Sequence, residues 1–343
     1  MQGTADRTVT LRRVAPLDHC HLRDCSAASV SCLRCPDQGI LVDVFCQPTI
    51  PRVMASDISP KPLPPYRGRA ATLDILRQPV ATHEISEITL PHPARLPTDP
   101  QSLPFRVFRA IPRAKPEKRG FPVLYMLDGT AAFDYLTPGL LEGVPGLAVI
   151  GIGYAGDAQF ARNDRVFDYT PPKVPGGAPF ADPHHGGRIA GGAERFADAL
   201  TGPLRQAAES GLAVDPARRS LWGHSLGGLC TLFVALTRPG AFARYMPASP
   251  SIWWNEPLMQ DLVAQARFDP AQPTPIHLVV GDREQRTGTA TPPPIGPPPI
   301  TMALADRLAA KPGVIFSSEV HEGAVHIATL PSSQPGALRR AAE

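Results

Sequence analysis

Continuous apolar runs alternate with stretches of helical periodicity over most of this chain, and this alternation limits the possible folds more than any other feature. FPVLYML (121–127) and GLAVIGIGY (146–154) lack the polar alternation of half-exposed strands, which predicts strands buried on both faces of a parallel sheet. RSLWGH, ARYMPAS, PIHLVVG and GVIFSSEV repeat this type. The intervening helices are expected at 193–210, 226–238, 256–267 and 301–310.

Two segments ahead of this region follow another pattern. Residues 83–90 and 104–112 alternate apolar and polar side chains, which is typical of half-exposed antiparallel strands. Together these patterns predict an α/β fold with a mostly parallel central sheet and helices on both of its faces.

Composition limits the class of protein further. The 343 residues suffice for one large α/β domain with extensions, and we expect an extension over 1–65 and the catalytic domain over 66–343. No apolar run approaches 18 residues, which argues against a membrane span. The net charge of +3 is too small to indicate a nucleic-acid partner.

The first 46 residues hold five of the six cysteines, and we expect them to form a disordered or non-native extension. Cys32 and Cys35 make a CxxC pair, and His19 and His21 lie nearby, so a small zinc site is the alternative. The segment lacks the apolar core of a signal peptide, which makes the cytoplasm the expected compartment. The periplasm is the alternative if the true N-terminus differs. The full set is Cys20, Cys25, Cys32, Cys35 and Cys46.

Two segments are predicted as loops because they are rich in glycine and proline. Residues 168–192 are a candidate lid or binding loop. Residues 287–300 carry six prolines in their last ten positions, which indicates a loop insertion, with an SH3-like partner as the alternative.

The decapeptide LWGHSLGGLC (221–230) carries the chemistry. Ser225 has a glycine two residues away on each side, follows an apolar strand and precedes a helical pattern, as a nucleophile elbow requires. The tight turn excludes side chains at the flanking positions and projects the serine hydroxyl beyond the sheet. The alternative is a glycine-rich turn with an idle serine.

A serine nucleophile needs a base and an acid, in the chain order Ser, acid, His. Three histidines follow Ser225: His277 lies inside a strand, His321 ends a strand, and His326 stands in a loop before the last helix. We favour His326 because a loop residue can turn toward the nucleophile. Asp282 and Glu284 both follow the strand PIHLVVG, and we favour Glu284 as the carboxylate that orients the imidazole.

The oxyanion of an acyl-transfer intermediate needs two donors. Leu226 starts the predicted helix after Ser225, so its amide is the first candidate. Thr130 follows the turn at Asp128-Gly129, and its amide is the second; an ordinary strand-to-helix turn capped by Asp128 fits the same residues.

Several ordered motifs resemble the esterase family of bacterial siderophore hydrolases. They are VLYMLDGTAAF, IGIGY, RVFDYTPP, GGAERF, LWGHSLGGL, ASPSIWWN and a late histidine, spread over about residues 80–340. The resemblance implies an α/β-hydrolase that opens ferric enterobactin-type trilactones with Ser225 as nucleophile and His326 as base. It also supports Glu284, although some members work with a Ser–His pair alone.

The resemblance implies a substrate site as well. Trp253 and Trp254 match a segment near the family's site, with a structural role in the core as the alternative. A ferric tris-catecholate is anionic, so we expect arginines near the site, foremost Arg165. No resident metal or organic cofactor is expected, because the iron arrives with the substrate. The other candidates are Arg162, Arg188 and Arg195.

Three features depart from the family pattern: the separate N-terminal domain of the larger enterobactin esterases is missing, and the proline-rich and cysteine-rich segments are added. A general carboxylesterase or acyltransferase of the same fold is the alternative function. A binding protein without catalysis on this scaffold is a further alternative, and no oligomeric state is predicted.

Overall fold

The computed structural model describes residues 32–34, 41–43, 69–92, 103–285 and 295–343. The chain divides into two units, Met1–Ser59 and Pro60–Glu343. In the first unit, β1 (Cys32–Arg34) pairs antiparallel with β2 (Leu41–Asp43). The predicted zinc site and most of the predicted extension lie outside the described residues, as does part of the proline-rich loop, residues 286–294.

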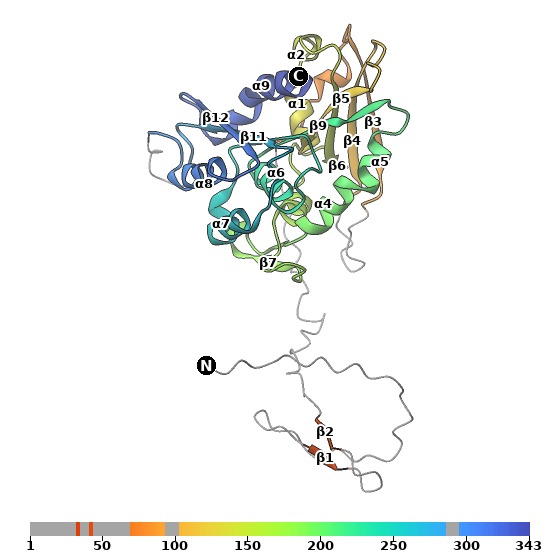
Figure 1. Cartoon of the computed structure of the whole chain (residues 1–343). Helices are drawn as coiled ribbons and strands as arrows, with labels where there is room; N and C mark the ends of the chain where they lie inside the picture. The colour runs from red at the N-terminus through yellow and green to blue at the C-terminus, as the bar shows by residue number, and fades with distance from the viewer. Residues whose placement is uncertain (1–31, 35–40, 44–68, 93–102, 286–294) are drawn as a thin grey trace. The chain divides into compact units, whose positions relative to one another are not determined.

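The second unit is built on an eight-stranded sheet with the order β12-β11-β10-β9-β5-β6-β4-β3 (Figure 1). Only β4 runs antiparallel to its neighbours β3 and β6, and the other pairings are parallel. The predicted α/β fold with a mostly parallel sheet is therefore confirmed. The strands are β3 (His83–Leu90), β4 (Phe105–Pro112), β5 (Phe121–Leu127), β6 (Ala148–Tyr154), β9 (Val214–His224), β10 (Arg244–Ala248), β11 (Thr274–Gly281) and β12 (Val314–His321).

Helices cover both faces of this sheet (Figure 1). On one face, α6 packs against β9 and β10, with α3, α4 and α7 around it. On the other face, α9 lies across β5, β9 and β10, and α1 packs against β6 and β4. The helices are α1 (Gly129–Tyr135), α2 (Pro138–Glu142), α3 (Arg162–Tyr169), α4 (Ala193–Thr201), α5 (Pro203–Ala208), α6 (Leu226–Thr237), α7 (Glu256–Gln265), α8 (Pro299–Ala309) and α9 (Thr329–Ala342).

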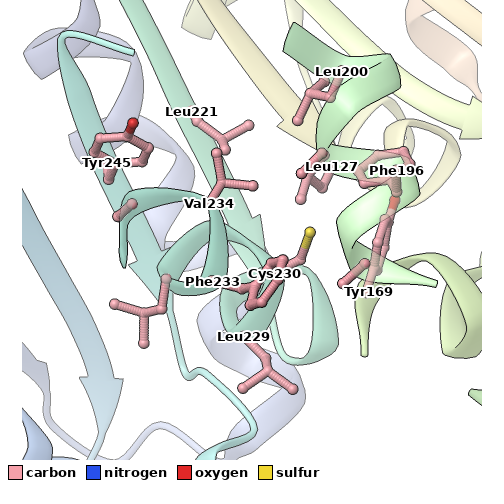
Figure 2. Packing of buried hydrophobic residues seen from close by; sticks show 14 of the residues in the cluster. Leu127, Tyr169, Phe196, Leu200, Leu221, Leu229, Cys230, Phe233, Val234 and Tyr245 are labelled. Carbon is pink, nitrogen blue, oxygen red and sulfur yellow. The ribbon is translucent and has the colours of Figure 1, made fainter. Parts of the chain in front are cut away.

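The period of two along each strand divides the core into two layers. Leu221 of β9 packs into the layer that holds α6, whereas the next residue, Trp222, packs into the layer that holds α9. Figure 2 shows the α6 layer, in which Leu229 and Phe233 of this helix lie with Phe196 of α4. All residues of β5 and β6 are buried, as their apolar runs predicted.

Three sequence predictions need correction. The stretch GVIFSSEV forms β12, but as an edge strand it is largely exposed, with Ile315 at 58% exposure. The single helix expected over 193–210 is two helices, because Pro203 cannot donate the hydrogen bond that continuation from α4 would need. The segment 168–192 is also more than a loop, since α3 ends at Tyr169 and residues further on form a hairpin.

This hairpin consists of β7 (Phe180–Asp182) and β8 (Arg188–Ala190), joined through the single turn η3 (Pro183–His185). Among the residues that the structure describes, no helix has the length and apolarity needed to cross a bilayer.

The connections of the sheet determine where a site can form. From β5 the chain passes to β6 on one side, and it later returns to β9 on the other side of β5. Such a reversal leaves a crevice at the carboxyl ends of the two strands, where ligands of open α/β sheets bind. Asp128 follows β5 and Ser225 follows β9 at this edge.

Candidate active site

Ser225 forms a sharp turn between β9 and α6. Its φ of 61° and ψ of −119° are unfavourable for a residue with a side chain. The amide of Ser225 donates to the Ala248 carbonyl at 3.0 Å, and its own carbonyl accepts from the Ser251 amide at 3.1 Å. The end of β10 and the segment after it therefore hold the strained turn in place.

The glycines around this serine are required to different degrees. A Cβ on Gly223 would lie 2.3 Å from the Gly227 carbonyl oxygen, and one on Gly228 would lie 2.7 Å from the Ala248 carbonyl oxygen. Both positions exclude any side chain because a backbone atom occupies the space. At Gly227 the closest contact would be 3.3 Å, to an Asp128 carboxylate oxygen, so this position is tight but less strictly limited.

The Ser225 hydroxyl belongs to a chain of three side chains from three loops. Its Oγ lies 3.0 Å from Nε2 of His326, and Nδ1 of the same ring lies 3.3 Å from Oε2 of Glu284. His326 begins the single turn η5 (His326–Ala328) after β12, and Glu284 follows β11. The imidazole is thus positioned to take the serine proton at Nε2 while the carboxylate faces its other nitrogen.

The competing candidates lie elsewhere. His321 bonds Ser332 Oγ at 2.6 Å and Glu319 at 3.1 Å, and His277 bonds Ser317 Oγ at 2.8 Å. Oδ1 of Asp282 has no hydrogen-bond partner among the described residues and lies 4.0 Å from Arg283. Of the two carboxylates left open by the sequence, the structure brings Glu284 to His326.

The two predicted oxyanion donors occupy different surroundings. Leu226 is the first residue of α6, where backbone N–H groups have no partner within the helix. Thr130 is the second residue of α1, and its amide lies where a Cβ on Gly153 of β6 would approach to 2.9 Å. Thr130 therefore lies against Gly153 of β6, and its amide as an oxyanion donor stays a prediction.

Arg165, predicted to bind the substrate, makes an internal ion pair. Its guanidinium holds both carboxylate oxygens of Asp128 at 2.8 Å, and the side chains are 11% and 2% exposed. Burial lowers the pKa of Arg165, but the charge and hydrogen bonds of Asp128 outweigh burial and raise it. The pair ties α3 to the loop after β5, helped by the hydrogen bond from the Asp128 amide to the Tyr169 hydroxyl.

The other predicted arginines are spread over three elements. Arg162 begins α3 and is exposed, and Arg195 is exposed on α4. Arg188 of β8 donates to Asn163 at 3.0 Å and to the His185 carbonyl at 2.5 Å. These contacts hold β8 against α3 and against the turn η3.

The two tryptophans have separate positions. Trp254 is buried, and its Nε1 donates to Asp182 Oδ2 at 2.7 Å, which fits the structural role in the core that the sequence left open. Trp253 is half-buried, and its ring lies about 6 Å from the rings of His184 and His185. The hairpin that carries these histidines is fixed by Asp182, which also bonds His185 Nδ1 at 2.5 Å.

Sequence reasoning missed four polar side chains that surround the triad. The Ser251 hydroxyl lies 3.2 Å from Ser225 Oγ, and Ser249 donates to Glu284 Oε1. His224 and Thr329 both bond the His326 carbonyl. The motif SPSIWW contains the two serines, but the sequence drew attention to its tryptophans, and nothing in the sequence links Thr329 to residues 80 or more positions earlier.

Comparisons with known proteins agree with this arrangement. The sequence profile of the family described as "Putative esterase" matches residues 104–296. The chain is 32% identical over 192 residues to the ferri-bacillibactin esterase BesA of Bacillus subtilis, covering 53% of this chain and 66% of that protein. It is 38% identical over 154 residues to the apo-salmochelin esterase of Escherichia coli, covering 43% of this chain and 47% of that protein.

The chain thus spans between about half and two thirds of the length of these curated relatives. Among solved structures, the enterobactin and salmochelin hydrolase IroE superposes with a TM-score of 0.61 at 25% identity, covering 78% of this chain and 99% of that one. The profile match extends over more than half of the sequence, and the chain therefore belongs to this putative esterase family.

Proposed function

We propose that this protein is a serine esterase that hydrolyses the ester bonds of catecholate-type siderophores. The observation that carries the proposal is the chain Ser225 Oγ, His326 Nε2 and Nδ1, Glu284 Oε2 at the carboxyl edge of the sheet. Acyl transfer through an acyl-enzyme needs a nucleophilic hydroxyl, a base that takes its proton and a carboxylate that orients the base, and this chain supplies them in that order.

The proposed reaction has two halves. Ser225 Oγ attacks the ester carbonyl carbon while its proton moves to His326 Nε2, and the resulting oxyanion accepts hydrogen bonds from backbone amides. The C–O bond of the ester then breaks, and His326 returns the proton to the leaving alkoxide. In the second half, water gives a proton to His326 and its oxygen attacks the acyl carbon. The bond from this carbon to Ser225 Oγ then breaks, and His326 returns the proton to Oγ.

The amide of Leu226 is the first oxyanion donor in this scheme, since it begins α6 directly after the nucleophile. The amide of Thr130 as second donor remains a prediction. No resident metal or organic cofactor is needed, because iron would enter with the substrate.

The names of the relatives support the substrate class, since they include ferri-bacillibactin and apo-salmochelin esterases. Trp253 is the tryptophan that a bound catecholate could contact, because it follows Ser251 by two residues and is half-buried. Because the proposed substrate is anionic, Arg162, Arg188 and Arg195 remain predicted binding residues. The cytoplasm as its compartment remains a prediction, which cell fractionation tests.

A turnover screen tests the function. Ferric and iron-free trilactone siderophores and simple p-nitrophenyl esters are incubated with the wild type, with Ser225→Ala and with the surface control Ser86→Ala, and product masses are recorded. We expect single-ester hydrolysis products from the trilactones with the wild type and Ser86→Ala only. A wide preference for simple esters would favour a general carboxylesterase, and transfer to an added alcohol an acyltransferase. Failure of a fluorophosphonate probe to label Ser225 would favour a binding protein.

A further inference from the structure

We propose that Ser249, Thr329 and His224 are positioning residues that lock the proposed acid and base into one hydrogen-bonded ring. The inference rests on the proposed function, because it assigns the ring a purpose in acyl transfer. Its members come from the end of β9, the segments after β10 and β11, the turn η5 and the start of α9, and we call them the clamp: His224, Ser249, Glu284, His326 and Thr329.

One half of the clamp fixes the carboxylate. Glu284 Oε1 accepts from the Gly281 amide at 2.8 Å and from the Ser249 hydroxyl. The side chain is 9% exposed, so these two donors replace most of its water. With Oε1 held in this way, Oε2 is the oxygen that faces His326 Nδ1.

The other half fixes the backbone of the base. The His326 carbonyl accepts from Thr329 Oγ1 at 2.7 Å and from His224 Nε2 at 2.8 Å. A carbonyl only accepts, so the proton of His224 resides on Nε2. Burial first and the neighbouring His326 second lower the pKa of His224 well below its usual value, which keeps this buried ring neutral.

A contact of 2.5 Å between Ser249 Oγ and Thr329 Oγ1 joins the two halves. The Ser249 hydroxyl donates its one proton to the carboxylate, because an ionised carboxylate can only accept. Thr329 is therefore the donor toward Ser249, and its one proton is shared between Ser249 Oγ and the His326 carbonyl. His224 Nε2 also reaches Thr329 Oγ1 at 3.1 Å. Ser249 thus donates to Glu284, and Thr329 and His224 both donate to the backbone carbonyl of His326.

Backbone strain is a second, independent observation. Ser249 has a φ of 42°, in the left-handed region that favours glycine, and its amide donates to Val279 at 2.7 Å. Ser249 therefore keeps a side chain in a conformation that costs backbone strain. Ser249 is 1% exposed and Thr329 is fully buried, so neither hydroxyl has water as a substitute partner.

The test uses substitutions that remove a hydroxyl while sparing the fold. Thr329→Val keeps the shape, and Ser249→Gly relieves the unfavourable φ, so we expect the melting temperature of Ser249→Gly to stay near that of the wild type. For both we expect kcat on p-nitrophenyl esters to fall by about 10- to 100-fold, the cost of a misplaced catalytic group, with KM changed by less than about 2-fold. Thr329→Ser should restore kcat to within about 3-fold of the wild type.

A second readout does not depend on turnover. The Nδ1–H proton resonance of His326, assigned by its loss in His326→Ala, should shift in Thr329→Val and Ser249→Gly in the same direction as in Glu284→Gln. The matched control is Thr301→Val, a buried threonine of α8, which should leave kcat and this resonance unchanged.

The outcomes separate the two proposals. A wild type that hydrolyses no ester but shows the expected resonance shifts would refute the proposed function and leave the clamp standing. An active wild type whose kcat and resonance survive Thr329→Val and Ser249→Gly would overturn the clamp. The clamp is also overturned if Thr329→Ser is as impaired as Thr329→Val, or if KM rises while kcat holds.

Discussion

Two carboxylate–histidine pairs of the described residues look alike as chemistry and differ in their surroundings. Glu284 and His326 meet at 3.3 Å with side chains 9% and 25% exposed. Asp168 and His92 meet at 2.8 Å with side chains 0% and 2% exposed. The first pair reaches a serine hydroxyl, whereas the second lies among aromatic rings.

The second pair joins the segment after β3 to α3. The His92 ring stacks on Phe105 at 4.3 Å, and the Tyr154 hydroxyl donates to the same Asp168 oxygen at 2.7 Å. Burial lowers the pKa of His92, but the hydrogen bond and charge of Asp168 outweigh burial and raise it. His92 Nδ1 has no hydrogen-bond partner among the described residues, so no nucleophile connects to this pair.

The difference teaches that a carboxylate–histidine pair gains a chemical role from the partner of its second nitrogen and from access to substrate. Where both are missing, the same contact is a buried ion pair that fixes two chain segments. Five variants break or sharpen this comparison.

The largest effect is expected from His326→Ala. Loss of the base should reduce kcat/KM for esters by about 10⁴-fold or more, because nucleophile and base act as a unit. Thermal stability should change little, since the ring is partly exposed. Steady-state kinetics and a melting curve measure the two quantities; strong destabilisation with modest loss of activity would contradict the proposed role.

Glu284→Gln is expected to act on the same reaction with a smaller effect. An amide cannot stabilise the imidazolium as a carboxylate does, so kcat should fall by about 10²- to 10⁴-fold with KM nearly constant. Kinetics on a p-nitrophenyl ester provide the measurement. An unchanged kcat would indicate a Ser225–His326 pair that works without an acid.

His92→Ala should show the opposite profile. Removal of the imidazole leaves the Asp168 charge in the core without its ionic partner, which should destabilise the fold by about 3 kcal/mol. The activity per folded molecule should stay within about 3-fold of the wild type, because the pair makes no contact with Ser225. Urea denaturation and active-site titration test these values, and a folded but inactive variant would show that the comparison is wrong.

The buried pair also predicts a pH dependence of stability. Burial raises the pKa of the adjacent Asp164 to about 6, so the folded state binds this proton more tightly than the unfolded state, and stability falls as pH rises through this value. The raised pKa of His92 acts in the same direction. Its contribution to folding stability is complete below the unfolded-state pKa of about 6.5 and is lost as pH rises through the pKa of the folded state.

Asp164→Asn isolates the first of these two groups. Its melting temperature should increase relative to the wild type between pH 4 and pH 7, since only the wild type must bury a charge. The Asn side chain can still accept the Leu103 amide, which Asp164 binds at 2.7 Å. A constant difference between the two melting curves over this range would refute the assignment.

The smallest effect is expected from Asp282→Asn. This carboxylate follows β11 just as Glu284 does, but its nearest cation, Arg283, lies 4.0 Å away and His326 is not its partner. We expect kcat/KM to stay within about 2-fold of the wild type. A loss comparable with that of Glu284→Gln would reverse the choice between the two carboxylates.

Much of the fold could be predicted because local patterns carry it. Burial on both faces makes β5 and β6 uniformly apolar, and the elbow at Ser225 is specified within a few residues by Gly223 and Gly228. The period of β12 could not reveal its exposure, because an edge position depends on the absence of a neighbouring strand. The last two residues of α3, Asp168 and Tyr169, could not be predicted as helical because they begin a segment rich in glycine and proline.

By itself, the sequence determined the strand–turn–helix around Ser225, the alternation that builds the sheet, and the late histidine that stands in a loop. Only the tertiary structure decided that Arg165 pairs with Asp128, that Trp254 is buried, and that Glu284 rather than Asp282 faces His326. The reason is physical. A turn or a strand is fixed by steric and burial preferences of neighbouring residues, whereas a hydrogen bond between side chains tens of residues apart depends on how the whole sheet brings its loops together.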